Sequence, residues 1–300
     1  MIEKVTFNNS ATPFMDSVNE KVNNYFRENN LSRTGNWKLY SKTVILLPLY
    51  ILFFVLMITL HYHSALNFLS AALLGFTSAL IGFNVMHDGS HGSYSGNKFL
   101  NLLMAHSANL IGAEAYFWKT KHNVLHHVYT NIDGLDDDIA KYPMFRFCKQ
   151  QERKRFHRFQ HFYWVLLYSL ASIFWLYFMD FQKYFSGKII GNYKYPKMDF
   201  IQHLIFWITK ISHVFIFIVF PIYMIGILPA IACLITMHFV LGITLTIVFQ
   251  LAHVVEGTSF SSLVEGNIKK EWAIHQMNTT ANFANKNKAL CWVLGGLNFQ

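Results

Sequence analysis

The chain has 300 residues, a length that fits one large domain or two small ones. Hydrophobic residues make up 53% of it and charged residues 14%, whereas soluble proteins average about 25% charged residues. The net charge of +9 raises nucleic acid as a partner, but the basic residues lie between long apolar runs, so we expect no nucleic-acid partner. The composition favours an integral membrane protein. Its three cysteines are isolated and indicate neither a disulfide framework nor a thiolate metal site.

The N-terminal part of the chain is predominantly polar and precedes the first apolar run, so we expect no secretory signal peptide. Residues 1–42 are expected to form a cytosolic N-terminal segment, and residues 43–300 a membrane domain. Two long uncharged runs open that domain, and a helix needs about 20 such residues to cross a bilayer. They predict a first helical hairpin, 43–62 with 66–86.

A second pair of apolar runs lies in the C-terminal half and is interrupted at Gly226 and Pro229. It predicts a second hairpin, with helices at about 203–226 and 229–250. The aromatic run 162–178 is also long, but a crossing there would carry the lysines that follow it to the outer face, against the positive-inside rule. We therefore expect this run, and the apolar stretch between the first two histidine groups described below, to lie in the interface without crossing.

The fold class that these runs predict is all-α and integral to the membrane. It has four transmembrane helices in two hairpins, one or two interfacial helices, and a cytosolic helical cap. Basic residues cluster in 1–42, 149–158 and 183–197, whereas the short connections within the hairpins carry none. Both termini are therefore expected on the cytosolic side.

Histidine is the residue type that carries the chemistry of this sequence, with fifteen copies. Six of them form three groups, each at or near the expected cytosolic end of an apolar run. In chain order these are His87 with His91, His122 with His126 and His127, and His253. Their common side of the membrane predicts that the expected cap holds a metal site.

The spacing within the groups indicates how metal could be bound. Residues four apart lie on one helical face, so their imidazoles can reach a common ion. We expect His122 and His126 to be such a pair, with His127 turned toward a second ion. Six imidazoles exceed the four ligands of a tetrahedral zinc, which suggests two ions. Imidazole also suits copper, iron and nickel, so the ligand type leaves the metal open.

The other histidines are expected to be packing or interfacial residues. His61 and His63 lie in the outer connection of the first hairpin and cannot reach the site. His275 stays open as a ligand, because its neighbours offer no second donor. The remaining ones are unpaired in sequence: His106, His157, His161, His203, His213 and His238.

Three motifs resemble the membrane fatty-acid desaturase family, most closely its linoleoyl-CoA and front-end, Delta-6-type branch. They are HDGSH at 87–91, HNVLHHVYTNIDGLDDDI at 122–139 and QLAHVVEG at 250–257. The resemblance runs from about Asn84 to the last residue, where GGLNFQ looks like the lead-in to the third histidine motif of this branch, QIEHH.

The resemblance implies a centre of two iron ions with O2 as co-substrate. It implies six ligands in this sequence: His87, His91, His122, His126, His127 and His253. It places Gln300 at the start of the third motif, and it makes Asp136, Asp138 and Glu256 candidate hydrogen-bond acceptors for imidazole N–H groups. It assigns no catalytic residue beyond the metal ligands.

In the family, the third motif continues past its glutamine with two more histidine ligands. From the resemblance we expect the desaturase domain at 43–300 to lack its C-terminal part. We expect this 300-residue chain to bind metal poorly and to be inactive as it stands.

The function that the resemblance implies is the O2-dependent introduction of a double bond into a long-chain acyl-CoA or acyl-lipid. Electrons would come from a separate ferredoxin or cytochrome b5, since the chain has no haem, rubredoxin-type or flavin motif. Membrane lipid is the other expected partner. Alternatives are a fatty-acyl hydroxylase or ketolase on the same scaffold, a non-catalytic membrane protein that binds or transports metal, and a membrane zinc hydrolase.

Overall fold

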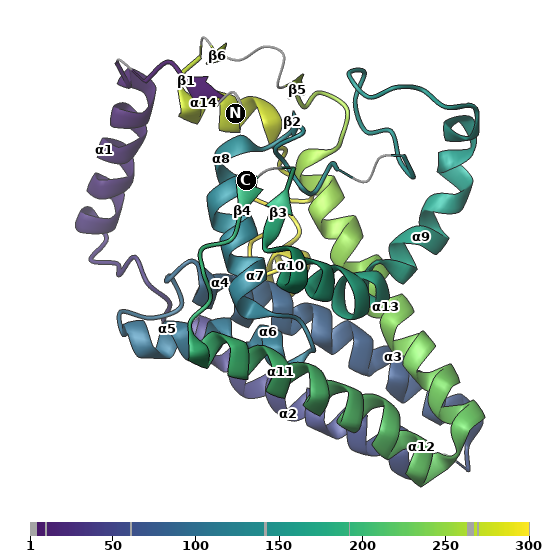
Figure 1. Cartoon of the computed structure of the whole chain (residues 1–300). Coiled ribbons are helices and arrows are strands. Elements are labelled where there is room, and N and C mark those ends of the chain that lie inside the picture. Colours follow the sequence, from purple (N-terminus) through teal and green to yellow (C-terminus); the bar gives the residue numbers. More distant parts are fainter. Residues whose placement is uncertain are drawn as a thin grey trace.

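The architecture is mostly helical, with long helices at one end of the molecule and short helices and strands gathered at the other (Figure 1). It is seen in a computed structural model. The residues that the structure describes are 5–9, 11–60, 62–140, 143–191, 193–262, 267–268 and 270–299.

The first long hairpin joins α2 (Trp37–Thr59) to a continuous helical segment that ends at Ser90. The side chain of Asn36 caps α2 by accepting a hydrogen bond from the backbone of Lys38. The returning segment consists of α3 (Ser64–Ile81), the π-helix η1 (Gly82–Met86) and α4 (His87–Ser90). Both predicted helices of this hairpin are therefore present, and each extends beyond its predicted bounds at one or both ends.

The second long hairpin is formed by the segments on either side of Gly226. That glycine has a φ of 87°, a left-handed conformation that glycine adopts without strain and that ends the helix before it. The outgoing segment consists of α11 (Phe200–Val214), the π-helix η5 (Phe215–Val219) and α12 (Phe220–Ile225), and the returning helix is α13 (Ile227–His253).

A fifth apolar helical segment runs from Arg155 to Ser186. It consists of the 3-10 helix η3 (Arg155–Phe159), α9 (Gln160–Phe174), the π-helix η4 (Trp175–Met179) and α10 (Asp180–Ser186). The described chain thus contains five helical segments long and apolar enough to cross a membrane. Length and composition do not distinguish this segment from the four expected spans.

Helix α13 is the central helix, because it packs along both α3 and α9. Small residues permit these close approaches. A Cβ atom on Gly75 of α3 would collide with the carbonyl of Met237 on α13, and one on Gly242 of α13 would meet the carbonyl of Ser169 on α9. Fully buried side chains such as Leu74 fill the space between α2, α3 and α13.

The other end of the molecule is a cap of short elements (Figure 1). Its strands form three two-stranded pairs: β1 with β6 and β2 with β5 in parallel, and β3 with β4 antiparallel. The cap elements are β1 (Thr6–Phe7), α1 (Pro13–Glu28), α7 (Ala115–Thr120), the π-helix η2 (Lys121–His126), α8 (His127–Tyr129), β2 (Ile132–Asp133), β3 (Lys188–Ile190), β4 (Tyr193–Lys194), β5 (Ser261–Ser262), β6 (Asn267–Ile268), α14 (Trp272–Thr279) and α15 (Lys288–Val293). The short helices α5 (Lys98–Ala105) and α6 (Ser107–Leu110) lie beside the long helices (Figure 1).

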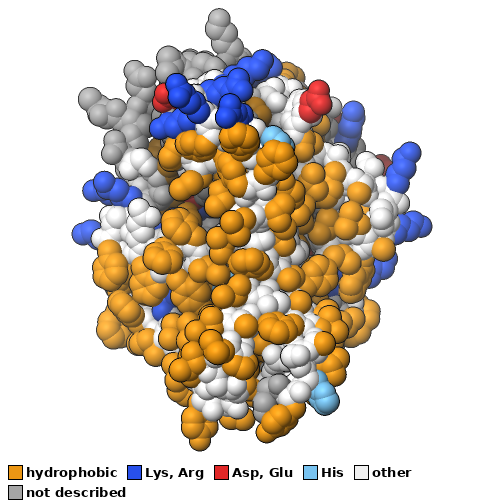
Figure 2. All heavy atoms as spheres, turned by 90° about the vertical axis from the view of Figure 1, so that its right-hand side faces the viewer, with side chains coloured by type: hydrophobic (Ala, Val, Ile, Leu, Met, Phe, Trp, Pro, Cys, Tyr) orange, Lys and Arg blue, Asp and Glu red, His pale blue; other side chains and the backbone are white. Residues whose placement is uncertain are grey.

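The long helices expose large apolar side chains over a wide area. Figure 2 shows this surface from the side of α9, with Lys and Arg gathered above a face that is mostly hydrophobic. Exposed residues on the 155–186 segment include Phe162, Leu166, Phe174 and Phe178. So much exposed apolar surface suits lipid and not water. The chain is a multi-pass membrane protein.

The close approach of α3 and α13 makes a testable prediction about stability. Replacing Gly75 with alanine should lower the free energy of unfolding in detergent by about 1–3 kcal/mol, and with it the melting temperature. The reason is that the new methyl group meets backbone that cannot move aside. The matched control is Gly96→Ala, since a Cβ at Gly96 meets open space. Equal melting temperatures for the two variants would contradict this account of the helix contact.

Candidate metal centre

A π-helix immediately precedes the first histidine group, and a second π-helix contains His122 and His126 of the second group. In η1 the backbone N–H of His87 donates to the carbonyl of Gly82, and in η2 that of His127 donates to the carbonyl of His122. Such i→i+5 turns are rare in proteins and occur most often at functional sites. The π-helices therefore point to the same two segments as sites of function that the histidine spacing indicates.

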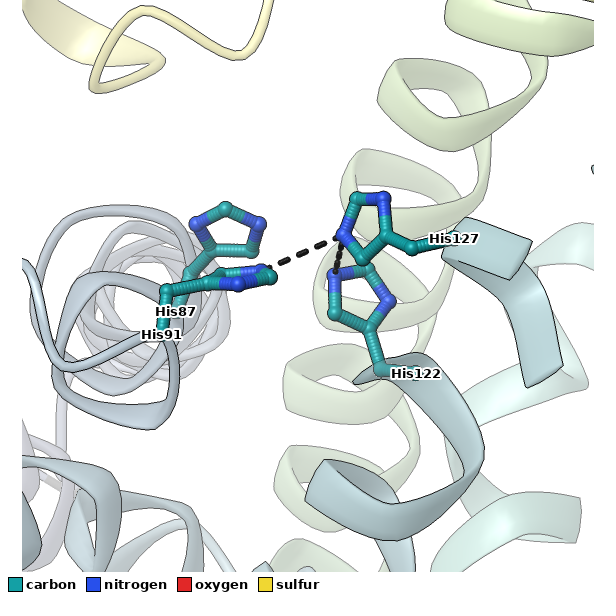
Figure 3. Close-up of side chains that lie close together, drawn as sticks. All are labelled: His87, His91, His122 and His127. Carbon is teal, nitrogen blue, oxygen red and sulfur yellow. Dashed lines mark hydrogen bonds between the residues drawn. The ribbon is translucent and has the colours of Figure 1, made fainter. Parts of the chain in front are cut away.

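Four of the six predicted ligands lie together. His87, His91, His122 and His127 each offer a ring nitrogen, and these four atoms lie within 4.8 Å of one another. Figure 3 shows the pair from the α4 region facing the pair from η2 and α8. The Nε2 atom of His127 lies 3.2 Å from Nε2 of His91 and 3.0 Å from Nε2 of His122.

The other two predicted ligands form an adjacent pair. His126 on η2 and His253 at the end of α13 are both buried, and their Nε2 atoms lie 3.2 Å apart. The Nδ1 atom of His253 faces the carbonyl of Thr279 at 3.4 Å, and Asn131 donates to the backbone carbonyl of His253 at 2.8 Å. These contacts leave the Nε2 atom of each ring directed at the other ring.

The pairing within the second motif differs from the sequence expectation. We expected His122 and His126, four residues apart, to share an ion, with His127 turned toward another. In the structure His122 groups with His127, and His126 groups with His253. The reason is η2, because i→i+5 hydrogen bonding brings residues five apart onto the same side of the turn.

Two of the three expected acidic partners contact a predicted ligand. Asp136 Oδ1 and Asp138 Oδ2 lie 3.1 and 3.2 Å from Nδ1 of His126, on the side of the ring away from His253. Asp136 also accepts from the backbone N–H groups of Asn131 and Asp138. These carboxylates therefore fix the orientation and tautomer of His126, although they and His126 also lie close enough together to be considered as an ion site.

The third expected acceptor, Glu256, is exposed, and in the described part of the chain it makes no hydrogen bond to a predicted ligand. Sequence reasoning overlooked Asp88, whose Oδ1 lies 3.4 Å from Nδ1 of His87. Its position beside the first histidine of HDGSH was the available signal. It also overlooked Lys121, which forms ion pairs with Asp137 and Asp138 and balances the charge of that loop.

Burial and mutual repulsion keep most of these imidazoles neutral. Burial, assisted by the neighbouring histidines, lowers the pKa of His91 to about 4 and that of His127 to about 3, and it lowers the pKa of His122 well below its usual value. Burial also acts to lower the pKa of His126, but Asp136 and Asp138 outweigh it and leave that pKa raised. Neutral imidazole is the form that binds metal.

The donor set fits transition-metal ions. Imidazole nitrogens approach one another to 3.0–3.2 Å, and no carboxylate lies between them. A transition-metal cation bound between these nitrogens would stabilise this arrangement. The first group offers four imidazoles and the second offers two. An apolar hollow begins beside His87 and is lined by Met86, Ile111, Trp118, Trp175 and Phe249.

The remaining histidines lie outside both groups, as far as the structure describes them. His275 is buried and its Nε2 faces the carbonyl of Thr130 at 2.9 Å, so it has a structural partner. His157 contacts the carbonyl of Pro143, and His203 contacts Tyr184. The expectations for His61 and Gln300 fall outside the described residues.

The fold and the site together define a multi-pass membrane protein with six histidines converging at one end of its helical bundle. The profile of the family described as fatty acid desaturase matches residues 63–300. The chain therefore belongs to the fatty acid desaturase family, a family of oxidoreductases, and this membership confirms the resemblance seen in the histidine motifs.

Curated relatives agree with this assignment. The chain is 32% identical over 299 residues to the sn-1 linoleoyl-lipid 6-desaturase of Arthrospira platensis, covering 99% of this chain and 80% of that protein. It is 30% identical to the protein of the same name from a Synechocystis strain, covering 96% and 80%. It is 31% identical to the acyl-lipid (8-3)-desaturase of Physcomitrium patens, covering 94% of this chain and 60% of that protein.

The contact between His126 and Asp136 makes a prediction about metal binding. Asp136→Asn should weaken metal binding at this position by about 10–100-fold, because the amide no longer fixes the ring as a carboxylate does. Glu256→Gln should leave binding unchanged and serves as the control. Metal titration of both variants against the parent protein checks this. Equal losses in the two variants would contradict the roles assigned here.

Proposed function

We propose that this protein is an O2-dependent desaturase that uses two iron ions to introduce a double bond into a long-chain acyl lipid. The observation that carries the proposal is the pair of adjacent imidazole groups, His87/His91/His122/His127 and His126/His253, at the mouth of an apolar hollow. Family membership supports the reaction class.

Each part of the site has a defined task in this reaction. Iron, when bound, supplies the O2-dependent oxidising power needed to remove hydrogen from an unactivated methylene. His126 and His253 hold one position and the other four histidines hold the second. Asp136 and Asp138 keep the Nδ1 atom of His126 occupied, so that Nε2 faces inward. Trp118 stacks on His122 with ring centroids 4.3 Å apart and closes the apolar wall beside it.

The names of the relatives support a proposal for the substrate, and an electron donor is proposed with it. Two relatives are named as acting on linoleoyl-lipid and a third on acyl-lipid. We therefore propose an acyl chain carried on a membrane lipid, with the methylene to be oxidised approaching the histidine groups on the apolar side of His87. Electrons come from a separate carrier of the ferredoxin or cytochrome b5 type.

The proposed topology has four spans, with the site and both termini on the cytosolic side. His126 and His253 are in contact, so the chain between them crosses the membrane an even number of times. Three candidate segments lie in that stretch, Arg155–Ser186, Phe200–Ile225 and Ile227–His253, so one of them does not cross. We assign this role to Arg155–Ser186, because lysines follow it and the positive-inside rule keeps them cytosolic.

The topology can be tested by labelling engineered cysteines in intact membranes. A cysteine at Gly191, between β3 and β4, should be accessible from the same side as one at Gly96, between α4 and α5. A cysteine at His63, between α2 and α3, should be accessible only from the opposite side. Labelling of Gly191 together with His63 would contradict the four-span arrangement.

The proposed reaction can be tested by lipid analysis of a host that expresses the full-length gene. Acyl lipids should gain one new double bond, and the His122→Ala variant should abolish the product, because it removes one of the four clustered imidazoles. A hydroxylated or oxidised acyl chain in place of the alkene would instead favour the hydroxylase or ketolase chemistry that this scaffold also permits.

A further inference from the structure

A second polar cluster lies inside the helical bundle, where α10 and η4 face α11. Each of the two facing helical segments contributes two side chains that lie three residues apart. Tyr177 and Asp180 come from η4 and α10, and Lys210 and His213 come from α11. Residues three apart share a helical face, so the two faces form a seam of two layers. Such groups are costly in an apolar bundle and rarely occur there without a role.

The first layer is an ion pair. Lys210 Nζ donates to Asp180 Oδ2 at 2.6 Å, to the carbonyl of Gly112 at 2.7 Å and to the carbonyl of Leu176 at 3.0 Å. These three bonds account for all three N–H donors of the ammonium group. Lys210 therefore has no donor left for the second layer.

The second layer brings together Tyr177, His213 and, from α13, His238. The Tyr177 ring lies 5.8 Å from that of His213 and 5.6 Å from that of His238, and the two imidazole centroids are 6.4 Å apart. His213 and His238 are 5% and 0% exposed, so neither has access to bulk solvent or to lipid.

Four polar atoms of this layer have no hydrogen-bond partner among the described residues. They are Oη of Tyr177, both ring nitrogens of His213 and Nε2 of His238, and Oδ1 of Asp180 one turn away is in the same condition. The seam thus holds five of the eleven buried side-chain atoms of this kind in the described chain. Each such buried group needs an explanation.

The tautomer of His238 determines which hydrogen bonds an occupant of this layer must make. The Ser172 hydroxyl donates to the His238 carbonyl, so it accepts from Nδ1–H of the same residue. Nε2 of His238 is therefore a bare acceptor that needs a donor. His213 presents one donor and one acceptor, and Tyr177 can supply either. The occupant must both donate and accept hydrogen bonds, which excludes an acyl chain.

The layer offers a metal ion only two imidazoles, and neither histidine belongs to a group of three or more potential metal ligands in the described chain. The ring centroids of His213 and His238 lie 6.4 Å apart. Two hydrogen bonds of about 2.7–3.2 Å each through one small molecule suit this gap.

We propose that Tyr177, His213 and His238 form an internal water-binding site within the bundle, separate from the metal centre. One water donates to Nε2 of His238 and bonds to His213 and to Tyr177 Oη, the three partners that a buried water typically has. It links η4, α11 and α13.

The direct test is a structure of the full-length protein in lipid at a resolution that reveals ordered water. Density within hydrogen-bond distance of both Tyr177 Oη and His238 Nε2 is the expected result. Direct bonding between these side chains, or ligand distances of about 2.0–2.1 Å as for a metal ion, would overturn the proposal.

A double-mutant cycle provides a second test that does not depend on resolution. Tyr177→Phe and His238→Leu should each lower the melting temperature, and the double variant should lower it by less than the sum, because both residues bind the same water. Tyr223→Phe is the matched control, since Tyr223 is 84% exposed on α12. Additive losses would refute a shared water. Iron content should stay at the parent level in every variant, so this result is independent of the proposed enzyme activity.

Discussion

Three chain segments converge on one point, and the helices and the cap are arranged around it. Helices α3 and α13 are returning helices of two hairpins, so both direct their C-terminal ends to the same end of the bundle. The turn η2 is placed between those ends by cap elements and supplies the third set of imidazoles. Burial there keeps most of the rings uncharged, so that their lone pairs are available to metal.

The buried histidines of the bundle fall into two sets. Those at the end of α13 and in η2 point ring nitrogens at one another, and two carboxylates lie against His126. His213, at the end of α11, and His238, near the middle of α13, have ring centroids 6.4 Å apart and lie beside the Tyr177 ring. Ring spacing and hydrogen-bond partners, and not burial alone, distinguish the two sets.

Sequence reasoning reached the two hairpins because uninterrupted apolar runs leave few alternatives, and it identified the histidines because their grouping is hard to attribute to packing. It reached Asp136 and Asp138 through the resemblance, and the structure places both against His126. It did not foresee η2, because no residue type specifies a π-turn, and so it did not foresee the close contact of His122 with His127. It also could not find the Lys210–Asp180 pair, because contacts between distant segments leave no local pattern. The apolar segment from Arg155 to Ser186 fits a span and an interfacial helix equally well by composition.

We infer two neighbouring metal positions at this site, one held by four imidazoles and the other by His126 and His253. Elemental analysis of the purified full-length protein can compare the parent with His253→Ala. Two iron ions per chain are expected in the parent and about one in the variant, because the four-histidine group remains intact. One metal ion per chain in both proteins, or zinc in place of iron, would rule out this arrangement.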